Sequence, residues 1–301
     1  MVDIGHKMEN NIQKNESIGN LNGKTIVVKY GGAAMKSADL KKCVISDIAK
    51  IKESKANVVI VHGGGPDLTA LQERLGLETK FVDGLRFTDD QTIDAALMAL
   101  CGKVNKDIVR LLENEGHGAV GLSGIDGSVV CCKKQENPDL GFVGEITQIN
   151  EKLLSVLLSE GFIPVISSIG IGNDGNAYNI NADTVAGRIA AELKADYYIT
   201  LSDVPGVLKD VNDPESQIVQ MYDFEAENFI SDGVISGGMI PKIKGIVDAI
   251  NRGAESASIV DGRVEHALLI TFKEIIATER GETSDNRGQS IGTTILKGSK
   301  E

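Results

Sequence analysis

The sequence predicts an α/β fold built on a mostly parallel, doubly wound sheet. Two runs of apolar, β-branched residues, 25–30 and 58–61, each end in glycines and are followed by apolar residues at helical spacing. The same alternation of strand and helix resumes after residue 150. A chain of 301 residues can bury a large core, as one α/β domain or as two lobes. Ligands are expected beyond the carboxyl ends of the parallel strands.

The centre of this prediction is the stretch 58–65, Val-Val-Ile-Val-His-Gly-Gly-Gly. Four β-branched apolar residues in a row are typical of a strand buried on both faces, and three glycines cannot continue it. Pro66 follows, and residues 67–75 have the pattern of a helix start. Bare backbone N–H groups and a helix N-terminus together attract an anion, so we interpret the loop as an anion site. A tight strand-to-helix turn that binds nothing is the alternative.

The helices are predicted from periodicity and from their ends. Thr88 and Gln91 form a capping-box signature that opens a long helix from about Asp89, and Gly116 is a suitable stop. Asn150 caps another helix. Helical spacing indicates the remaining helices over 40–51, 183–193 and 239–252.

The remaining strands are predicted from short β-branched or apolar runs. We expect 119–122, 128–132 and 142–149 to form an antiparallel hairpin region over the crevice. Further strands are predicted over 163–168, 197–201, 257–260 and 267–272. Residues 279–290 are expected to be a surface loop, and residues 1–20 a tail or a short added helix.

Composition excludes several classes of partner. The formal net charge is −12 and no basic run occurs, which argues against a nucleic-acid partner. No apolar run approaches 18 residues, and residues 1–20 are polar, so we expect no membrane segment, no signal peptide and a cytoplasmic location. The 4 cysteines lack metal-ligand spacing and are interpreted as reduced, structural thiols.

Two lysines stand where a charge needs a partner. Lys29 interrupts an apolar strand just before Gly31 and Gly32, and a buried ammonium must meet water, a carboxylate or a phosphate. Lys242 lies in the first turn of the helix predicted over 239–252, where the helix dipole disfavours a cation, so an anion is expected to compensate it. An edge or ion-paired Lys29 and a solvated Lys242 are the structural alternatives.

Other polar residues are candidates for holding an anionic ligand. Asp183 and Asn179 lie near a helix start, where ordinary capping explains them; alternatively, the Asp183 carboxylate holds two lysines and the Asn179 amide fixes a substrate. The planar fork of Arg86 suits a carboxylate or a phosphate, unless it pairs with an acidic neighbour. His62 fits a packed strand end better than a base or a metal ligand.

Three common motifs are absent from the sequence. It has no G-x-x-x-x-G-K-[S/T] P-loop, no G-x-G-x-x-G with a suitable acidic residue downstream, and no Ser or Cys nucleophile motif. What remains is a set of glycine loops, two lysines and an aspartate. These residues are typical of phosphoryl transfer, in which the protein positions the reactants and neutralises the charge of the phosphate.

Six segments taken together resemble the amino acid kinase family, and most closely its members that phosphorylate N-acetyl-L-glutamate. Each segment alone is weak evidence, but all occur in the family's order across residues 23–272. The segments are Lys29-Tyr30-Gly31-Gly32, His62-Gly63-Gly64-Gly65-Pro66, Val82-Asp83-Gly84-Leu85-Arg86-Phe87-Thr88, Asn179-Ile180-Asn181-Ala182-Asp183, Leu201-Ser202-Asp203-Val204-Pro205-Gly206-Val207 and Gly237-Gly238-Met239-Ile240-Pro241-Lys242.

The resemblance implies an open αβα sandwich with a mostly parallel central sheet. Residues 21–176 would form an N-terminal lobe that binds the acyl-amino acid, and residues 177–301 a C-terminal lobe that binds ATP, in one continuous fold. The implied reaction transfers phosphate from ATP, with Mg²⁺ carried by the nucleotide, to the γ-carboxylate of N-acetyl-L-glutamate. This reaction is a step of arginine biosynthesis.

The resemblance also implies roles for individual residues. Lys29 and Lys242 would stabilise the transferring phosphoryl group, and Asp183 would orient both lysines. Four residues would hold the acetylated substrate: Gly64, Gly65, Arg86 and Asn179. The remaining residues would contact the nucleotide or its phosphates: Gly31, Gly32, Gly63, Ser202, Asp203, Gly206, Gly238 and Met239.

The two ends of the chain leave oligomerisation and regulation open. Family members that arginine inhibits have an N-terminal helix linking dimers into a hexamer, and His-Ala-Leu-Leu soon followed by Gly-x-Gly-Thr. Here His266-Ala267-Leu268-Leu269 is separated from Ile291-Gly292-Thr293 by an intervening segment. We expect a homodimer, with a hexamer and arginine inhibition as alternatives. Other readings are a kinase for another carboxylate, such as N-acetylaminoadipate, and a non-catalytic sensor of arginine or nucleotide.

Overall fold

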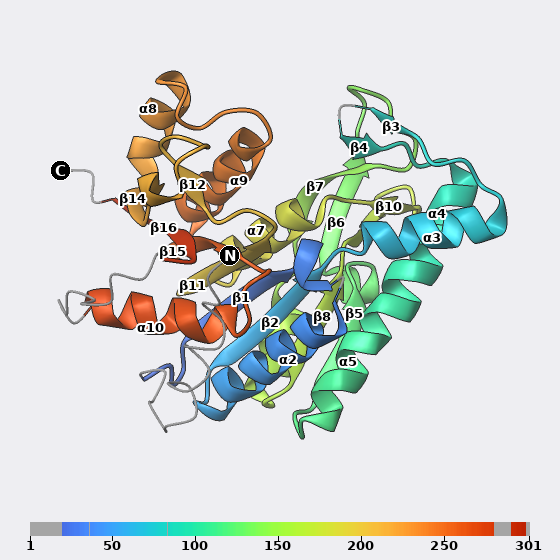
Figure 1. Cartoon of the computed structure of the whole chain (residues 1–301). Helices are drawn as coiled ribbons and strands as arrows, with labels where there is room; N and C mark the ends of the chain where they lie inside the picture. The colour runs from blue at the N-terminus through green and yellow to red at the C-terminus, as the bar shows by residue number, and fades with distance from the viewer. Residues whose placement is uncertain (1–19, 36, 83, 280–289, 299–301) are drawn as a thin grey trace.

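The structure is a computed structural model that describes residues 20–35, 37–82, 84–279 and 290–298 (Figure 1). Its centre is an eight-stranded sheet in the order β14-β16-β15-β11-β1-β2-β8-β5. All pairs in this sheet are parallel except β15 with β16, which confirms the mostly parallel sheet. Its strands are β1 (Thr25–Tyr30), β2 (Asn57–His62), β5 (Ala119–Ser123), β8 (Ile163–Ser167), β11 (Tyr197–Ser202), β14 (Gln220–Tyr222), β15 (Ser256–Asp261) and β16 (Gly292–Leu296).

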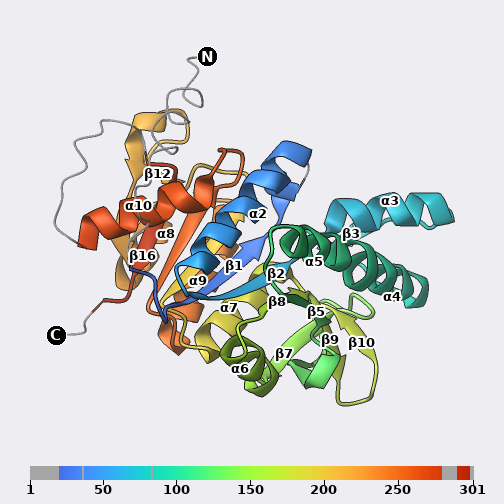
Figure 2. The same cartoon turned by 90° about the horizontal axis from the view of Figure 1, so that it is seen from below.

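Helices cover both faces of this sheet, as Figure 2 shows from below. One apolar core lies between the sheet and α2 (Ala38–Glu53), α5 (Asn105–Asn114) and α10 (Ala267–Glu279). A second core lies between the other face and α6 (Lys152–Ser159), α7 (Ala182–Glu192), α8 (Ala226–Ser231) and α9 (Met239–Arg252). The central strands β1 and β2 are buried on both faces, as their apolar β-branched runs predict. The αβα sandwich is thereby confirmed.

A smaller four-stranded sheet lies beside the main one, in the order β10-β9-β6-β7. Its strands are β6 (Val130–Lys134), β7 (Gly144–Ile149), β9 (Ile169–Gly172) and β10 (Ala177–Asn179). The predicted antiparallel hairpin is β6 with β7. The prediction for 119–122 was wrong in placement, because this segment is β5 at the edge of the main sheet, parallel to β8. Two short hairpins complete the strands: β3 (Phe81–Val82) with β4 (Leu85–Arg86), and β12 (Val207–Leu208) with β13 (Gln217–Ile218).

A third layer of helices lies beyond the main sheet, at one end of the molecule in Figure 1. It holds α3 (Gly65–Leu75) and α4 (Asp90–Ala96), and α4 continues through a π-helical segment (Leu97–Val104) into α5. The capping prediction was off by one residue. The cap is Asp89, whose carboxylate accepts from the Thr92 amide at 2.8 Å, while the Thr88 hydroxyl donates to the Arg86 carbonyl.

The strand predicted over 267–272 was wrong, because these residues begin helix α10. A short apolar run fits a buried helix as well as a buried strand, and here all but Ile270 are buried. The last strand is instead β16, which pairs with β15. None of the helices in the described ranges is long and apolar enough to cross a membrane. The predictions for residues 1–20, apart from Asn20, and for most of 279–290 lie outside the described residues.

Candidate functional site

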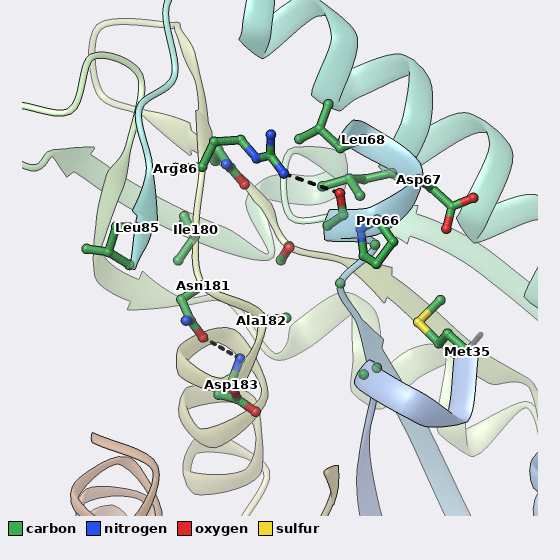
Figure 3. Close-up of a pocket in the computed structure, with 18 of the residues that line it drawn as sticks. Met35, Pro66, Asp67, Leu68, Leu85, Arg86, Ile180, Asn181, Ala182 and Asp183 are labelled. Carbon is green, nitrogen blue, oxygen red and sulfur yellow. Dashed lines mark hydrogen bonds between the residues drawn. The ribbon is translucent and has the colours of Figure 1, made fainter. Parts of the chain in front are cut away.

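A cavity of about 620 Å³ lies beyond the carboxyl ends of β1 and β2, where ligands are expected in an open α/β sheet (Figure 3). Two glycine loops bound it on one side, and the segment between β10 and α7 bounds it on the other. Nine residues predicted for the site line this cavity: Lys29, Gly31, Gly32, Gly63, Gly64, Gly65, Arg86, Asn179 and Asp183.

The glycine loop after β2 is shaped by the helix that packs beneath it. Gly64 has φ +151°, and a Cβ there would lie 2.7 Å from Cδ2 of Leu100 and 3.1 Å from Cγ2 of Val104. Both neighbours belong to the π-helical segment. Gly64 is also the N-cap of α3 and makes no side-chain cap bond, so a glycine is required there and the first amides of α3 have no side-chain acceptor at the cap. This geometry suits an anion.

Asp183 lies between the two lysines. Lys29 Nζ is 3.0 Å from Asp183 Oδ1, and Lys242 Nζ is 3.8 Å from Oδ2. Three elements meet here: β1 brings Lys29, α7 brings Asp183, and α9 brings Lys242. Asn181 caps α7 by accepting from the Asp183 amide at 2.8 Å, which fixes the start of the helix (Figure 3). One carboxylate shared by two ammonium groups leaves a net positive charge for an anion.

Arg86 is a buried cation, and its hydrogen-bond partners among the described residues are all neutral acceptors. Its side chain hydrogen-bonds to the amide oxygen of Gln72, to Thr69 Oγ1 at 2.8 Å and to the Gly65 carbonyl at 3.2 Å. The guanidinium lies 4.8 Å from the centre of the Phe81 ring. Arg86 is only 9 % exposed, burial lowers the pKa of its guanidinium, and no carboxylate in the described ranges pairs with it. Its uncompensated charge therefore favours an anionic ligand.

Asn179 lines the cavity, whereas His62 lies buried beneath its glycine loop and does not line it. The Asn179 amide donates to Thr88 Oγ1 at 3.3 Å. His62 is buried below the loop, with Asn105 Nδ2 at 3.0 Å from its Nε2 and the Gly63 carbonyl at 2.8 Å from its Nδ1. Burial lowers the pKa of His62 to about 4, so the ring is neutral at pH 7. His62 is thus a packed residue at a strand end, as predicted.

A second cavity of about 240 Å³ adjoins the first and shares Asn181 and Asp183 with it. Its lining also includes Gly238, predicted to contact the nucleotide, and Lys242, predicted to be catalytic. Tyr198 and Thr200 of β11 line it as well. The sequence reasoning missed the last two. Their period-two spacing on one strand was a usable signal, since residues i and i+2 share a face.

Four of the predicted nucleotide residues line neither cavity: Ser202, Asp203, Gly206 and Met239. The Ser202 carbonyl accepts from the Gly262 amide at 2.8 Å, and its hydroxyl lies 3.5 Å from Asp203 Oδ1. Gly206 has φ +106°, and a Cβ there would lie 2.6 Å from Thr293 Oγ1, so this glycine is needed for the turn itself. Asp83 of the matching motif lies outside the described residues.

The sequence reasoning also missed the residues that hold Arg86. Thr69 and Gln72 lie three residues apart on α3 and therefore face the same way. The sequence shows this spacing, but nothing in it indicates that β4 packs against the face of α3 that carries Thr69 and Gln72. The four cysteines are free thiols, as predicted.

Comparison with known proteins agrees with this geometry. The model of the amino acid kinase family matches residues 24–261. An acetylglutamate kinase of Brachyspira hyodysenteriae is 47% identical over 249 residues, 82% of this chain and 86% of that protein. One of Clostridium kluyveri is 49% identical over 259 residues, 85% of this chain and 92% of that protein.

A solved structure supports the fold alone. Carbamate kinase from Giardia lamblia bound to AMP-PNP aligns with a TM-score of 0.65 at 17% identity, covering 92% of this chain and 99% of that chain. The family model and the relatives each cover most of the sequence. The chain therefore belongs to the amino acid kinase family, among its acetylglutamate kinases.

Proposed function

We propose that this protein transfers the terminal phosphoryl group of ATP to the γ-carboxylate of N-acetyl-L-glutamate, giving N-acetyl-L-glutamyl 5-phosphate and ADP in arginine biosynthesis. The observation that carries the proposal is one cavity with two separate cationic ends. Arg86, which pairs with no carboxylate in the described ranges, lines one end of this cavity, and Lys29 and Asp183 line the other, where Lys242 reaches Asp183 from the adjoining cavity. An acceptor with two carboxylates matches these two ends.

The acceptor is held mainly through its non-reacting groups. Arg86 binds its α-carboxylate, since a planar guanidinium pairs with a carboxylate in two parallel hydrogen bonds. The Asn179 amide and the backbone N–H groups of Gly64 and Gly65 hold the rest of the acetylated amino acid. Fixing the α-carboxylate directs the γ-carboxylate toward the lysines. The reaction barrier is then smaller, because the substrate has already lost its freedom of motion on binding.

The reaction step joins two anions. An oxygen of the γ-carboxylate attacks the terminal phosphorus, the bond from phosphorus to the bridging oxygen breaks, and ADP leaves with that electron pair. The carboxylate is already ionised at neutral pH, so the attack requires no general base. Lys29 and Lys242 screen the charge on the transferring group, Asp183 keeps both lysines in place, and the amides of Gly31, Gly32 and Gly63 bind phosphate oxygens.

ATP is proposed to bind on the side of the C-terminal residues, 177–301, and the acceptor on the side of residues 21–176. Gly238 lines the second cavity beside Lys242. Ser202, Asp203, Gly206 and Met239 are proposed to border the nucleotide farther out. Mg²⁺ is proposed to arrive bound to ATP, where it would neutralise phosphate charge.

The assembly and regulation proposed here rest on the family. We propose a cytoplasmic homodimer, with a hexamer as the alternative. Inhibition by arginine is likewise an alternative.

The test is ADP release with Mg-ATP and N-acetyl-L-glutamate, run beside N-acetylaminoadipate, aspartate, carbamate and UMP, and repeated with arginine. Turnover confined to N-acetyl-L-glutamate supports the proposal. Turnover with another acceptor keeps the kinase and changes its substrate. Folded protein that binds ATP and turns over none of them would instead be a ligand sensor.

A further inference from the structure

Gln72 is a completely buried amide in the middle of α3, 0 % exposed. Burying an amide is costly unless its donors and acceptors are paired. Its oxygen accepts from Arg86 Nη1 and from Thr79 Oγ1 at 3.1 Å, and its nitrogen donates to Thr92 Oγ1 at 3.1 Å. The amide thus joins α3 to the β3–β4 hairpin, the loop before it and α4.

The orientation of this amide follows from its partners. A guanidinium can only donate, so the oxygen of Gln72 must face Arg86, and the nitrogen must face Thr92. One turn earlier on the same face of α3, Thr69 Oγ1 accepts from Arg86 Nη2 at 2.8 Å. The Phe81 ring covers the guanidinium, with 4.8 Å between Arg86 Cζ and the ring centre. Three neutral acceptors, counting the Gly65 carbonyl at 3.2 Å, and an aromatic ring therefore fix the plane of the guanidinium before any ligand binds.

We propose that Gln72 is a positioning residue for the acceptor carboxylate, acting through Arg86. This inference rests on the proposed function, in which Arg86 binds the α-carboxylate. Gln72 holds the guanidinium without neutralising it. A carboxylate at position 72 would hold Arg86 equally well in space but would cancel its charge and compete with the ligand.

The experiment is a double-mutant cycle between Gln72 and Arg86, read as kcat/KM for N-acetyl-L-glutamate from initial slopes, which stay measurable when saturation is lost. Gln72→Met keeps the volume and removes the amide, and we expect kcat/KM to fall roughly tenfold, as for a lost hydrogen bond to a charged group. We expect this loss in KM for the acceptor, with kcat and KM for ATP changed less than about twofold. Gln72→Glu should lower kcat/KM at least as far as Gln72→Met.

The decisive arm is Gln72→Met in the Arg86→Ala background. If Gln72 acts through Arg86, the second substitution changes kcat/KM by less than about twofold, because coupled residues are not additive. Thr271→Val is the matched control. It removes a buried hydroxyl whose bond, to the Ala267 carbonyl at 2.8 Å, lies in α10 on a different element, so it should lower the melting temperature and leave KM unchanged.

The possible results separate the two proposals. Wild-type protein without turnover of N-acetyl-L-glutamate refutes the proposed function, and the same cycle is then measured with the acceptor that is turned over, or as binding of N-acetyl-L-glutamate by calorimetry. Two results with an active wild type refute the role of Gln72. One is a Gln72→Met variant whose KM for the acceptor is unchanged. The other is a double variant in which the losses of kcat/KM from Gln72→Met and Arg86→Ala simply add. A fall in melting temperature without a change in KM means that the amide is only structural.

Discussion

Replacing Lys29 with methionine tests the phosphoryl end of the site. Lys29 is 8 % exposed on the central strand β1, and its Nζ lies 3.0 Å from Asp183 Oδ1. Methionine has a similar length and fits an apolar strand, so packing is largely kept. Asp183 still has Lys242 at 3.8 Å and remains partly exposed to water, so we expect a stability loss of only about 1 kcal/mol.

The effect on catalysis should be far larger than the effect on folding. Losing one preorganised donor at a developing charge costs about 3 to 4 kcal/mol in barrier height, which corresponds to a roughly 10²- to 10³-fold lower kcat. The assay is steady-state ADP release at saturating Mg-ATP and N-acetyl-L-glutamate, with folding checked by a thermal melt.

Lys24→Met serves as the control for this experiment. Lys24 immediately precedes β1 and pairs with Asp196 at 2.7 Å, at the opposite end of the same strand. Its loss should leave kcat within about twofold of the wild type. A folded Lys29→Met protein with kcat within about threefold of the wild type would refute the role assigned to Lys29.

Three further predictions concern residues that line the cavity or lie beneath its glycine loop. Gly64→Ala should destabilise the fold by about 1 to 3 kcal/mol in urea unfolding, because its Cβ would lie 2.7 Å from Leu100 at φ +151°, and it should raise KM for the acceptor; unchanged stability would contradict the packing argument. Arg86→Ala should lower kcat/KM for N-acetyl-L-glutamate at least tenfold while KM for ATP is kept, since it removes a charge-assisted contact to the acceptor alone. His62 has a folded pKa of about 4, below its unfolded value of 6.5, so the unfolded chain binds the proton first as pH falls. Stability should therefore decrease by up to about 3 kcal/mol between pH 6.5 and 4, and His62→Gln should remove that part of the pH dependence of the unfolding free energy.

Much of the fold follows from local patterns in the sequence. The strand 57–62, its glycines and α3 were predictable because a β-branched run and three glycines permit few other structures. The helix at residues 267–272 was not predictable, because six largely buried residues fit the periodicity of a helix and of a strand equally well. Only packing against the neighbouring elements decides between the two. The strand that pairs antiparallel with β15 is β16, which begins 31 positions after β15 ends.

The site was predictable in composition and less so in geometry. Lys29 and Asp183 are 154 positions apart in the sequence, and no local pattern predicts that their charged groups lie 3.0 Å apart. Their contact was expected from the family resemblance. The support of Arg86 by Gln72 was not foreseen, because a glutamine in the middle of a helix is ordinary unless the structure buries it. The π-helical segment under Gly64 also gave no sequence signal distinct from a regular helix.

The most direct test of the central claim is product analysis with N-acetyl-L-glutamate and Mg-ATP. Hydroxylamine traps an acyl phosphate as its hydroxamate, which can be counted against ADP and located by fragmentation in a mass spectrometer. Transfer to the γ-carboxylate predicts one γ-hydroxamate for each ADP released. ADP released without hydroxamate, or a hydroxamate on the α-carboxylate, would contradict an acceptor held by Arg86 at one end and phosphorylated beside Lys29 and Lys242 at the other.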